Sequence, residues 1–460
     1  MKHYDVIIIG AGPAGIFGAL ELVSSQAGLK ILLLEKGRDI EKRICPSEIK
    51  DVSCTVCPDC SLLSGWGGAG AFSDGKLSLS KEIGGNLSRH IDDSTLEDLI
   101  EYTDKIYIKY GAPPDVYGSD LEKVEALRSI SEKNGLVLVP CRIRHIGTDR
   151  CPELLKRLKA DLNSCVDILF SSDVTEILIK DHKVQGVEVS GGEKYHSDFV
   201  IAAPGREGSL WLEEQARALG LSLLRNPVDI GVRVELPANV LKPLTDVSYE
   251  PKLIFNSKKF NDKVRTFCVN PEGEVVKEYV KGVWTVNGHS YSNRITGNTN
   301  FAILVSTNFT EPFDEPHLYG RSVASLANLL GNGIILQRLG DLQSGRRSTP
   351  ERISGGSVSP SLSDAVPGDL SFVLPYRYIT DILEMLEVMD KIAPGVNSPD
   401  TLLYGVEVKF YSRQLKLGRN LETEVKNLFA IGDGAGVSRG LIQASVSGII
   451  AAREILKRIN

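Results

Sequence analysis

Four of the eight cysteines lie close together near the start of the chain, at positions 45, 54, 57 and 60. Two residues separate Cys54 from Cys57, and two more separate Cys57 from Cys60, so three thiolates can converge on one small object. This spacing is typical of iron–sulfur ligation, in which Cys45 would supply the fourth corner of a [4Fe-4S] cube. The pattern therefore indicates a centre that handles single electrons.

Three other interpretations of these cysteines remain open. Zinc also accepts four thiolates, although it more often uses two separated pairs. A C-x-x-C pair can instead act as redox thiols. The four residues could also be idle members of a loop. A disulfide framework would be unusual in a large intracellular chain.

The second half of the chain contains three candidates for acid–base or substrate-binding chemistry. His289 follows a strand-like run, where an imidazole could move a proton, with Arg294 nearby. Arg233 lies on the apolar strand pattern 230–236 and could grip a carboxylate, although an outward-facing arginine on an amphipathic strand fits as well. Glu407 is the third candidate catalytic residue.

Glu407 belongs to a short alternating pattern. Glu407, Lys409 and Arg413 are spaced so that they share one face of a strand. That face is either solvent-exposed or part of a substrate cleft.

A glycine-rich turn follows the first apolar strand. Gly10 permits the tight turn, Gly12 lets a diphosphate approach the backbone, and Gly15 lets the helix pack on the strand. The helix that follows directs its free N–H groups and positive dipole at the phosphates. Glu35 ends the next strand, where a carboxylate can take both hydroxyls of a ribose. Together these residues predict a dinucleotide site.

Two distant segments favour FAD over NAD as the dinucleotide. The apolar run 199–203 ends in a small-residue turn at Gly205, and the run 427–431 leads into Gly432 and Asp433 before a final helix. Asp433 would bind the ribityl chain, while the helix would face the diphosphate. On its own, the turn at 432–434 could equally be a strand-to-helix turn with Asp433 as a helix cap.

At this point the chain resembles the glutathione-reductase-like superfamily of FAD-dependent oxidoreductases. It is most similar to a branch of FAD-dependent dehydrogenases for which no substrate is defined. The resemblance covers essentially the whole chain, and the segments that carry it are 67–76 (GGAGAFSDGK), 265–273 (RTFCVNPEG), 286–290 (VNGHS) and 405–409 (GVEVK).

The resemblance implies further contacts with FAD. The backbone of Val174 would face the adenine, and Gly67 and Gly68 would lie along the diphosphate and the flavin edge. The backbone after Gly440 would approach the pyrimidine end of the flavin ring. Disulfide reductases of the superfamily carry a second glycine fingerprint for NADPH, which is not found after residue 100. Electrons would therefore come from free NAD(P)H or an electron-transfer protein.

The elements required to position these residues predict an α/β protein. Residues 1–225 would form a Rossmann-type FAD-binding domain with a mostly parallel sheet, completed by residues 401–460. Residues 226–400 would form an α+β substrate or cap domain with an antiparallel sheet. Helices are expected at about 94–110, 119–134, 152–163 and 376–392, and a long surface loop at 343–370.

Composition excludes several function classes. The chain has 460 residues, a net charge of −6 and 7% aromatic residues, so a nucleic-acid partner is not expected. No apolar run approaches the ~20 residues needed to span a bilayer. The chain enters a strand at once, which leaves no room for a signal peptide, and we expect a cytoplasmic protein.

These observations lead to one principal interpretation and two alternatives. The principal one is an FAD-dependent oxidoreductase, a dehydrogenase or reductase of an unsaturated or otherwise reducible small molecule, with an iron–sulfur cluster that relays electrons to the flavin. The first alternative is an FAD enzyme that uses free NAD(P)H, with structural zinc or redox thiols. The second is a flavin-dependent factor associated with tRNA, which the acidic composition disfavours.

Overall fold

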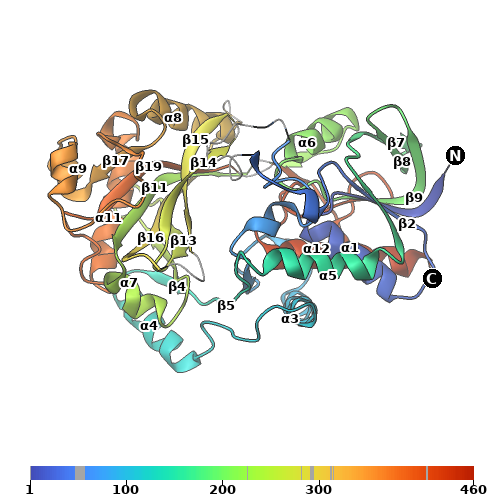
Figure 1. Cartoon of the computed structure of the whole chain (residues 1–460), viewed down its shortest axis with the longest axis horizontal. Coiled ribbons are helices and arrows are strands. Elements are labelled where there is room, and N and C mark those ends of the chain that lie inside the picture. Colours follow the sequence, from blue (N-terminus) through green and yellow to red (C-terminus); the bar gives the residue numbers. More distant parts are fainter. Residues whose placement is uncertain are drawn as a thin grey trace. The chain divides into compact units, whose positions relative to one another are not determined.

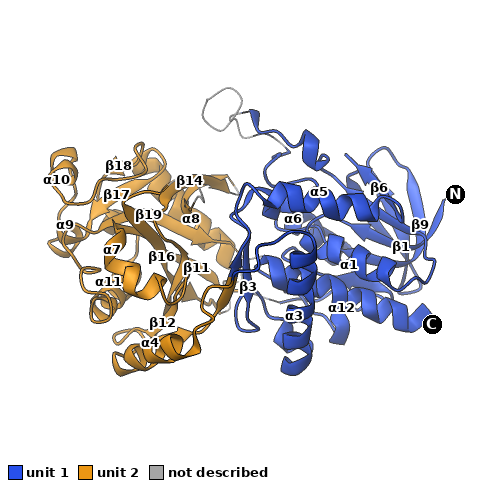
Figure 2. Ribbon diagram, turned by 60° about the horizontal axis from the view of Figure 1, so that its bottom comes forward, with its two compact units in different colours: residues 1–115, 144–225, 412–460 blue, residues 116–143, 226–411 orange. Residues whose placement is uncertain are grey.

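The computed structural model describes residues 2–46, 57, 59–224, 226–280, 282–290, 295–310, 313, 315–410 and 413–459. Two compact units divide the chain, and each combines segments that are distant in sequence (Figure 2). Unit 1 comprises residues 1–115, 144–225 and 412–460, and unit 2 comprises residues 116–143 and 226–411.

Unit 1 is built on a largely parallel sheet. Its central strands contain apolar runs that are buried, at 6–9, 31–34 and 199–202, as expected when both faces of a parallel sheet are covered. Among the described residues, the strands follow one another in the order β6 (Val166–Phe170), β2 (Ile31–Glu35), β1 (His3–Ile9), β9 (Lys194–Ala202), β8 (Lys183–Val189) and β7 (Val174–Lys180).

Strand β9 has two different neighbours on its second side. Its start pairs antiparallel with β8, and its end pairs parallel with β21 (Leu428–Ala430), where Val200 lies opposite Leu428. The C-terminal segment thus joins the sheet beside the strand that ends near Gly205. Two short strands of unit 1, β10 (Leu223–Leu224) and β20 (Gln414–Leu415), pair with each other. Strand β3 (Lys76–Leu79) comes earlier in the chain, and β5 (Arg142–His145) spans a boundary between the units.

The helices of unit 1 include the first and the last of the chain, which lie side by side (Figure 1). They cross where two glycines meet: a Cβ on Gly448 would lie 2.1 Å from the carbonyl oxygen of Ala14, and a Cβ on Gly18 would lie 3.5 Å from that of Gly448. Among the described residues, the helices of this unit are α1 (Pro13–Ser24), α3 (Asp93–Lys109), α5 (Cys151–Leu162), α6 (Ser209–Ala218) and α12 (Leu441–Ile459).

Unit 2 contains a mostly antiparallel sheet. Among the described residues its strands follow the order β18 (Val366–Pro367), β17 (Ile335–Arg338), β19 (Leu402–Lys409), β11 (Val228–Pro237), β16 (Asn298–Thr307), β13 (Lys263–Asn270), β12 (Lys252–Asn256) and β4 (Val137–Val139). A separate hairpin pairs β14 (Glu274–Val280) with β15 (Val283–His289).

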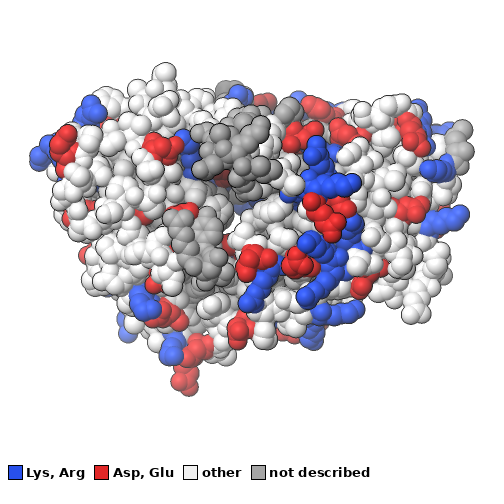
Figure 3. All heavy atoms as spheres, in the orientation of Figure 1, with Lys and Arg blue, Asp and Glu red and all other residues white. Residues whose placement is uncertain are grey.

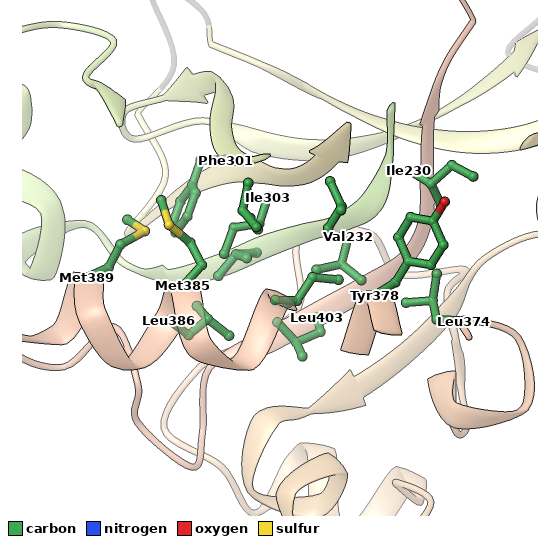
Figure 4. Packing of buried hydrophobic residues seen from close by; sticks show 14 of the residues in the cluster. Ile230, Val232, Phe301, Ile303, Leu374, Tyr378, Met385, Leu386, Met389 and Leu403 are labelled. Atoms are coloured by element: carbon green, nitrogen blue, oxygen red, sulfur yellow. The ribbon is translucent and has the colours of Figure 1, made fainter. Parts of the chain in front are cut away.

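Helix α11 covers the apolar face of this sheet (Figure 4). Met385 and Leu386 of the helix are fully buried against Ile303 of β16 and Leu403 of β19. Ile382 and Met389 are buried on the same face at helical spacing, so one stripe of the helix covers several strands. The helices of unit 2 are α4 (Leu121–Lys133), α7 (Ala238–Thr245), α8 (Pro316–Gly331), α9 (Leu339–Gln343), α10 (Pro350–Ser354) and α11 (Tyr376–Asp390).

The α/β fold class expected from the sequence is confirmed. The expected boundary between 225 and 226 coincides with one between the units, but residues 116–143 and 401–411 belong to another unit than expected. Residues 116–143 belong to unit 2, because β4 pairs with β12 through Val139 and Lys252. Residues 401–411 also belong to unit 2, because β19 lies between β11 and β17.

The segment 343–370 is not the continuous surface loop that its composition predicted. It contains α10 and β18, and the side chains of Ser348 and Val358 are buried within it. Thr349 caps α10 by accepting a hydrogen bond from the backbone N–H of Arg352.

Within the described part of the chain, no helix has both the length and the apolar character that crossing a bilayer requires. On the face shown in Figure 3, acidic and basic side chains are interspersed.

The glycine crossing of α1 and α12 gives a stability prediction. Alanine at 448 places its methyl group against a backbone carbonyl that cannot move without shifting α1. We expect Gly448→Ala to lower the free energy of unfolding by about 1–3 kcal/mol, measured by guanidinium denaturation. Gly18→Ala is the matched control, since its methyl makes ordinary contacts and alanine favours a helix by about 0.5–1 kcal/mol. Equal stability of the two variants would contradict the close approach of Gly448 to the carbonyl oxygen of Ala14.

Candidate functional site

The three glycines of the first turn have different structural roles. Gly10 has φ +99°, and a Cβ there would lie 2.2 Å from the carbonyl oxygen of Ala203. A Cβ on Gly15 would lie 2.0 Å from the carbonyl oxygen of Gly10. A Cβ on Gly12, by contrast, would meet no described atom within 4 Å. The outer two glycines are therefore required by the protein's own packing, whereas Gly12 borders open space.

That open space lies at the start of α1. Gly12 is the N-cap residue, no side chain caps the helix, and Pro13 occupies the first turn. The first amides of an α-helix have no partner within the helix, and the helix dipole adds partial positive charge at this end. The arrangement is suited to an anion such as a diphosphate.

Glu35 is bound by the backbone on three sides. Its Oε1 accepts hydrogen bonds from the N–H groups of Gly37 and Gly65, at 2.8 and 2.9 Å, and its Oε2 accepts one from Ala11, at 2.7 Å. A carboxylate has about four acceptor positions. One position on Oε2 is thus left for a sugar hydroxyl, instead of the two that the sequence suggested.

Arg43 holds the segment 61–68 in place. Its buried guanidinium donates hydrogen bonds of 2.7–2.9 Å to four backbone carbonyl oxygens, those of Ser61, Leu62, Trp66 and Gly68. Burial lowers the pKa of Arg43 to about 10, although Glu35 and Cys60 act in the opposite direction. The segment is therefore folded around one internal cation.

The hydrogen bonds of Arg43 hold Gly67 and Gly68 next to the first glycine turn. Gly67 donates a hydrogen bond of 2.8 Å to the carbonyl oxygen of Ala11. Gly68 has φ +57°, and a Cβ on it would lie 3.2 Å from the Cα of Gly12. Gly68 thus packs against Gly12, whereas a Cβ on Gly67 would lie 2.3 Å from Cδ1 of Leu155.

The C-terminal turn 432–434 packs against two glycine segments that come earlier in the chain. A Cβ on Gly432 would lie 3.1 Å from the Cβ of Ala14 in α1, and one on Gly434 would lie 2.7 Å from the carbonyl oxygen of Gly205. Asp433 is partly exposed and accepts a hydrogen bond of 2.6 Å from Ser438. The turn thus lies beside both earlier glycine segments of unit 1.

The start of α12 is held by a short antiparallel contact. Gly85 is bridged to Ser438, and a Cβ on Gly440 would lie 3.4 Å from the Cα of Gly84. Gln443 donates to the carbonyl oxygens of Lys81 and Ile83. The backbone after Gly440 is thereby fixed at the beginning of the helix.

The residues predicted from the sequence to bind FAD fall in one of the two units. Gly10, Gly12, Gly15, Glu35, Gly67, Gly68, Gly205, Gly432, Asp433 and Gly440 all lie in unit 1. Val174 is buried at the start of β7, opposite Val189 of β8, and it also belongs to unit 1.

The cysteine cluster is described in part. Cys45, Cys57 and Cys60 are half-buried, and Cys54 lies outside the described residues. Cys60 begins a turn, because its carbonyl oxygen accepts hydrogen bonds from the N–H groups of Leu63 and Ser64. Among the described residues, no group of three potential metal ligands comes together.

In unit 2 the structure brings Arg233 and Glu407 together at 3.2 Å, with both side chains fully buried. The remaining bonds of the guanidinium go to Asn300 Oδ1, Asn270 Oδ1 and the carbonyl oxygen of Cys268. All three nitrogens of the Arg233 guanidinium therefore donate hydrogen bonds within the protein. It stabilises the interior of the sheet and is not placed to grip a substrate carboxylate.

Lys409 forms the outer part of the same cluster, 2.9 Å from Glu407. Burial acts to lower the pKa of Lys409, but the carboxylates of Glu407 and Glu278 outweigh this effect, so the pKa is raised. The direction of this shift favours the charged form of Lys409. Arg413, which was expected on the same strand, lies beyond the end of β19 and in unit 1.

His289 is the last residue of β15 and is half-buried. The preceding residue, Gly288, packs directly on the cluster: a Cβ on it would lie 2.2 Å from Nη2 of Arg233 and 2.1 Å from Oδ1 of Asn300. The three candidates from the sequence thus lie in one region of unit 2. Arg294 lies outside the described residues.

Sequence reasoning missed Arg43, Asn270 and Asn300. Asn270 lies within the motif 265–273 that carried the family resemblance, so this segment contained a signal. Arg43 and Asn300 have no local pattern, because their partners are distant in sequence.

One family model and one curated relative match the chain. Residues 227–410 match the family described as "FAD-dependent protein, C-terminal domain-like", which covers the longer segment of unit 2. The chain is 28% identical over 478 residues to an uncharacterized protein of Clostridium beijerinckii (strain ATCC 51743 / NCIMB 8052), covering 99% of this chain and 81% of that protein.

Among solved structures, L-proline dehydrogenase from P. horikoshii aligns with a TM-score of 0.42 and 13% identity, over 99% of this chain and 94% of its own. Formate oxidase of Aspergillus oryzae RIB40 aligns with a TM-score of 0.44 and 13% identity, over 99% and 98%. The family match and the glycine turn of unit 1 agree, and both support an FAD-dependent oxidoreductase.

The contact of Gly288 with the buried cluster can be tested by adding one methyl group. Gly288→Ala places its methyl group on Arg233 and Asn300, and we expect a loss of about 2–4 kcal/mol in the free energy of unfolding, measured by denaturant titration. Gly297→Ala in the same unit is the control, because its Cβ meets no described atom within 4 Å. A Gly288→Ala protein as stable as Gly297→Ala would show that the cluster tolerates expansion.

Proposed function

We propose that the chain binds FAD in unit 1 and uses it to oxidise or reduce a small molecule that unit 2 recognises. The observation that carries the proposal is the open space beside Gly12, at the uncapped start of α1. The family match supports the same cofactor. Membership of the glutathione-reductase-like branch is part of this proposal.

The residues of unit 1 would bind FAD mainly through the backbone. The amides at the start of α1 would hold the diphosphate, Oε2 of Glu35 would accept a ribose hydroxyl, and Asp433 would bind the ribityl chain. The backbone after Gly440 would face the pyrimidine end of the ring, and that of Val174 would face the adenine. The flavin itself supplies hydride or single-electron transfer.

Unit 2 would supply the groups that orient the substrate and move its proton. His289 is the proposed proton donor or acceptor, because it is half-buried and directly follows Gly288. Arg233 and Glu407 are positioning residues in this proposal, since both are enclosed and bound to each other. Their role is to fix Lys409 and the adjacent strands.

A single methyl group tests the FAD site. Gly12 has φ −78°, which any residue adopts, and a Cβ there meets no described atom, so Gly12→Ala should fold normally. Its methyl occupies the space proposed for the diphosphate. We expect the flavin content of the purified protein, read from its visible absorbance, to fall by about tenfold or more.

The control for this experiment is Gly18→Ala, which alters the same helix away from the open space and should retain the flavin. Wild-type protein that is folded, colourless and unable to take up added FAD would refute the proposed function.

The cysteines form a separate part of the proposal. We propose that Cys45, Cys54, Cys57 and Cys60 bind a [4Fe-4S] cluster, which would supply single electrons. The spacing supports this, as does the position of Cys60 beside the segment that Arg43 holds against the first glycine turn. Zinc and redox thiols are the alternatives.

Spectroscopy separates these alternatives. Protein purified without air and then reduced should give an electron paramagnetic resonance signal of a reduced cluster and contain about four irons per chain. We expect Cys60→Ser to abolish the signal, whereas Cys165→Ser, at an exposed cysteine far along the chain, should leave it unchanged. Stoichiometric zinc without iron would replace the cluster with a structural metal site.

A further inference from the structure

Three cations gather around one aromatic ring of unit 2. Nζ of Lys252 lies 5.1 Å from the centroid of the Phe267 ring, the guanidinium carbon of Arg265 lies 4.8 Å from it, and Nζ of Lys409 lies 5.7 Å from it. A cation within about 6 Å of a ring centroid is attracted by the ring. Three cations at one ring also repel one another, so this gathering needs a further cause.

Each of the three cations is paired with a carboxylate, which reduces the repulsion between them. Glu250 lies 2.5 Å from Lys252, Asp229 lies 2.5 Å from Arg265, and Glu407 lies 2.9 Å from Lys409. The carboxylates are 0–5% exposed, whereas the cations are 12–21% exposed. In each of these three pairs the cation is the more accessible group. The half-buried carboxylate of Glu278 also acts on Lys409, so the positive character is greatest at Lys252 and Arg265.

In a second contact of unit 2 between a lysine and an aromatic ring, the carboxylate is more exposed than the lysine. Lys277 lies 4.9 Å from the ring centroid of Trp284 and is paired with Asp364. Here the carboxylate is 55% exposed and the lysine 25%. A lysine on an aromatic ring is therefore not by itself the more accessible group of its pair.

The backbone next to Phe267 is strained. Cys268 has φ +42°, which is uncommon for a residue with a side chain, and the pairing of β13 with β16 shifts between Phe267 and Asn270. Arg233 donates a hydrogen bond of 2.6 Å to the carbonyl oxygen of Cys268. Strain that is held in place by a buried group is often found at binding sites.

We propose that Lys252, Arg265 and Lys409, around Phe267, form a subsite for the carboxylate of a small organic acid. A guanidinium binds a carboxylate through two parallel hydrogen bonds, and the two lysines add charge. The half-buried ring offers apolar surface for the organic part. This inference rests on the proposed function, for which it makes the substrate an organic acid.

The subsite can be tested on the purified holoprotein by isothermal titration calorimetry with benzoate, benzamide and inorganic phosphate. We expect saturable binding of benzoate and at least about tenfold weaker binding of benzamide, which has the same ring without the charge. Binding of phosphate in preference to benzoate would overturn the assignment to organic acids. Equal binding of benzoate and benzamide would overturn the role of the cations.

Substitutions test which side chains bind benzoate. Lys252→Gln and Arg265→Gln should each weaken benzoate binding by about tenfold. Lys277→Gln is the matched control and should bind benzoate like the wild type. Thermal denaturation of each variant verifies folding, and the comparison of benzoate with benzamide on the wild type needs no variant.

The flavin content, read separately, distinguishes this inference from the proposed function. Benzoate binding by a protein that takes up no FAD would refute the function and keep the subsite. FAD uptake by a protein that binds no benzoate would refute the subsite alone.

Discussion

The structure of unit 1 depends on how closely two backbone segments approach each other at the first glycine turn. Gly10 and Gly15 each leave no room for a methyl group, because a carbonyl oxygen occupies that space. This approach sets the direction in which α1 leaves the sheet. The open space beside Gly12 is a consequence of that direction, and so is the ability of the helix start to face an anion.

Internal charges organise both units in a similar manner. In unit 1, the guanidinium of Arg43 is enclosed by carbonyl oxygens and folds a loop around itself. In unit 2, Arg233 is enclosed by Glu407 and two asparagine side chains. A buried charge is costly unless it is fully bonded, so such groups favour one arrangement of the surrounding chain. Both arginines lie next to surfaces proposed to bind ligands.

Local patterns predicted much of this structure. The glycine turn, Glu35 and the final strand and helix follow from short sequence signals, because their geometry is determined by neighbouring residues. The division into units was predicted less well, since the pairing of β4 with β12 joins segments without any shared pattern. The burial of Arg233 was missed for the same reason: its partners at 270, 300 and 407 come from three other strands or their ends.

The chain passes between the two units at 115/116, 143/144, 225/226 and 411/412. The first and last helices, α1 and α12, pack on each other within unit 1. During translation, the amino-terminal strand and helix therefore emerge long before their partner, and unit 1 remains incomplete until α12 has been synthesised. No contiguous fragment contains either unit intact without part of the other, so expression of an isolated domain would require circular permutation or deletion of the intervening segments.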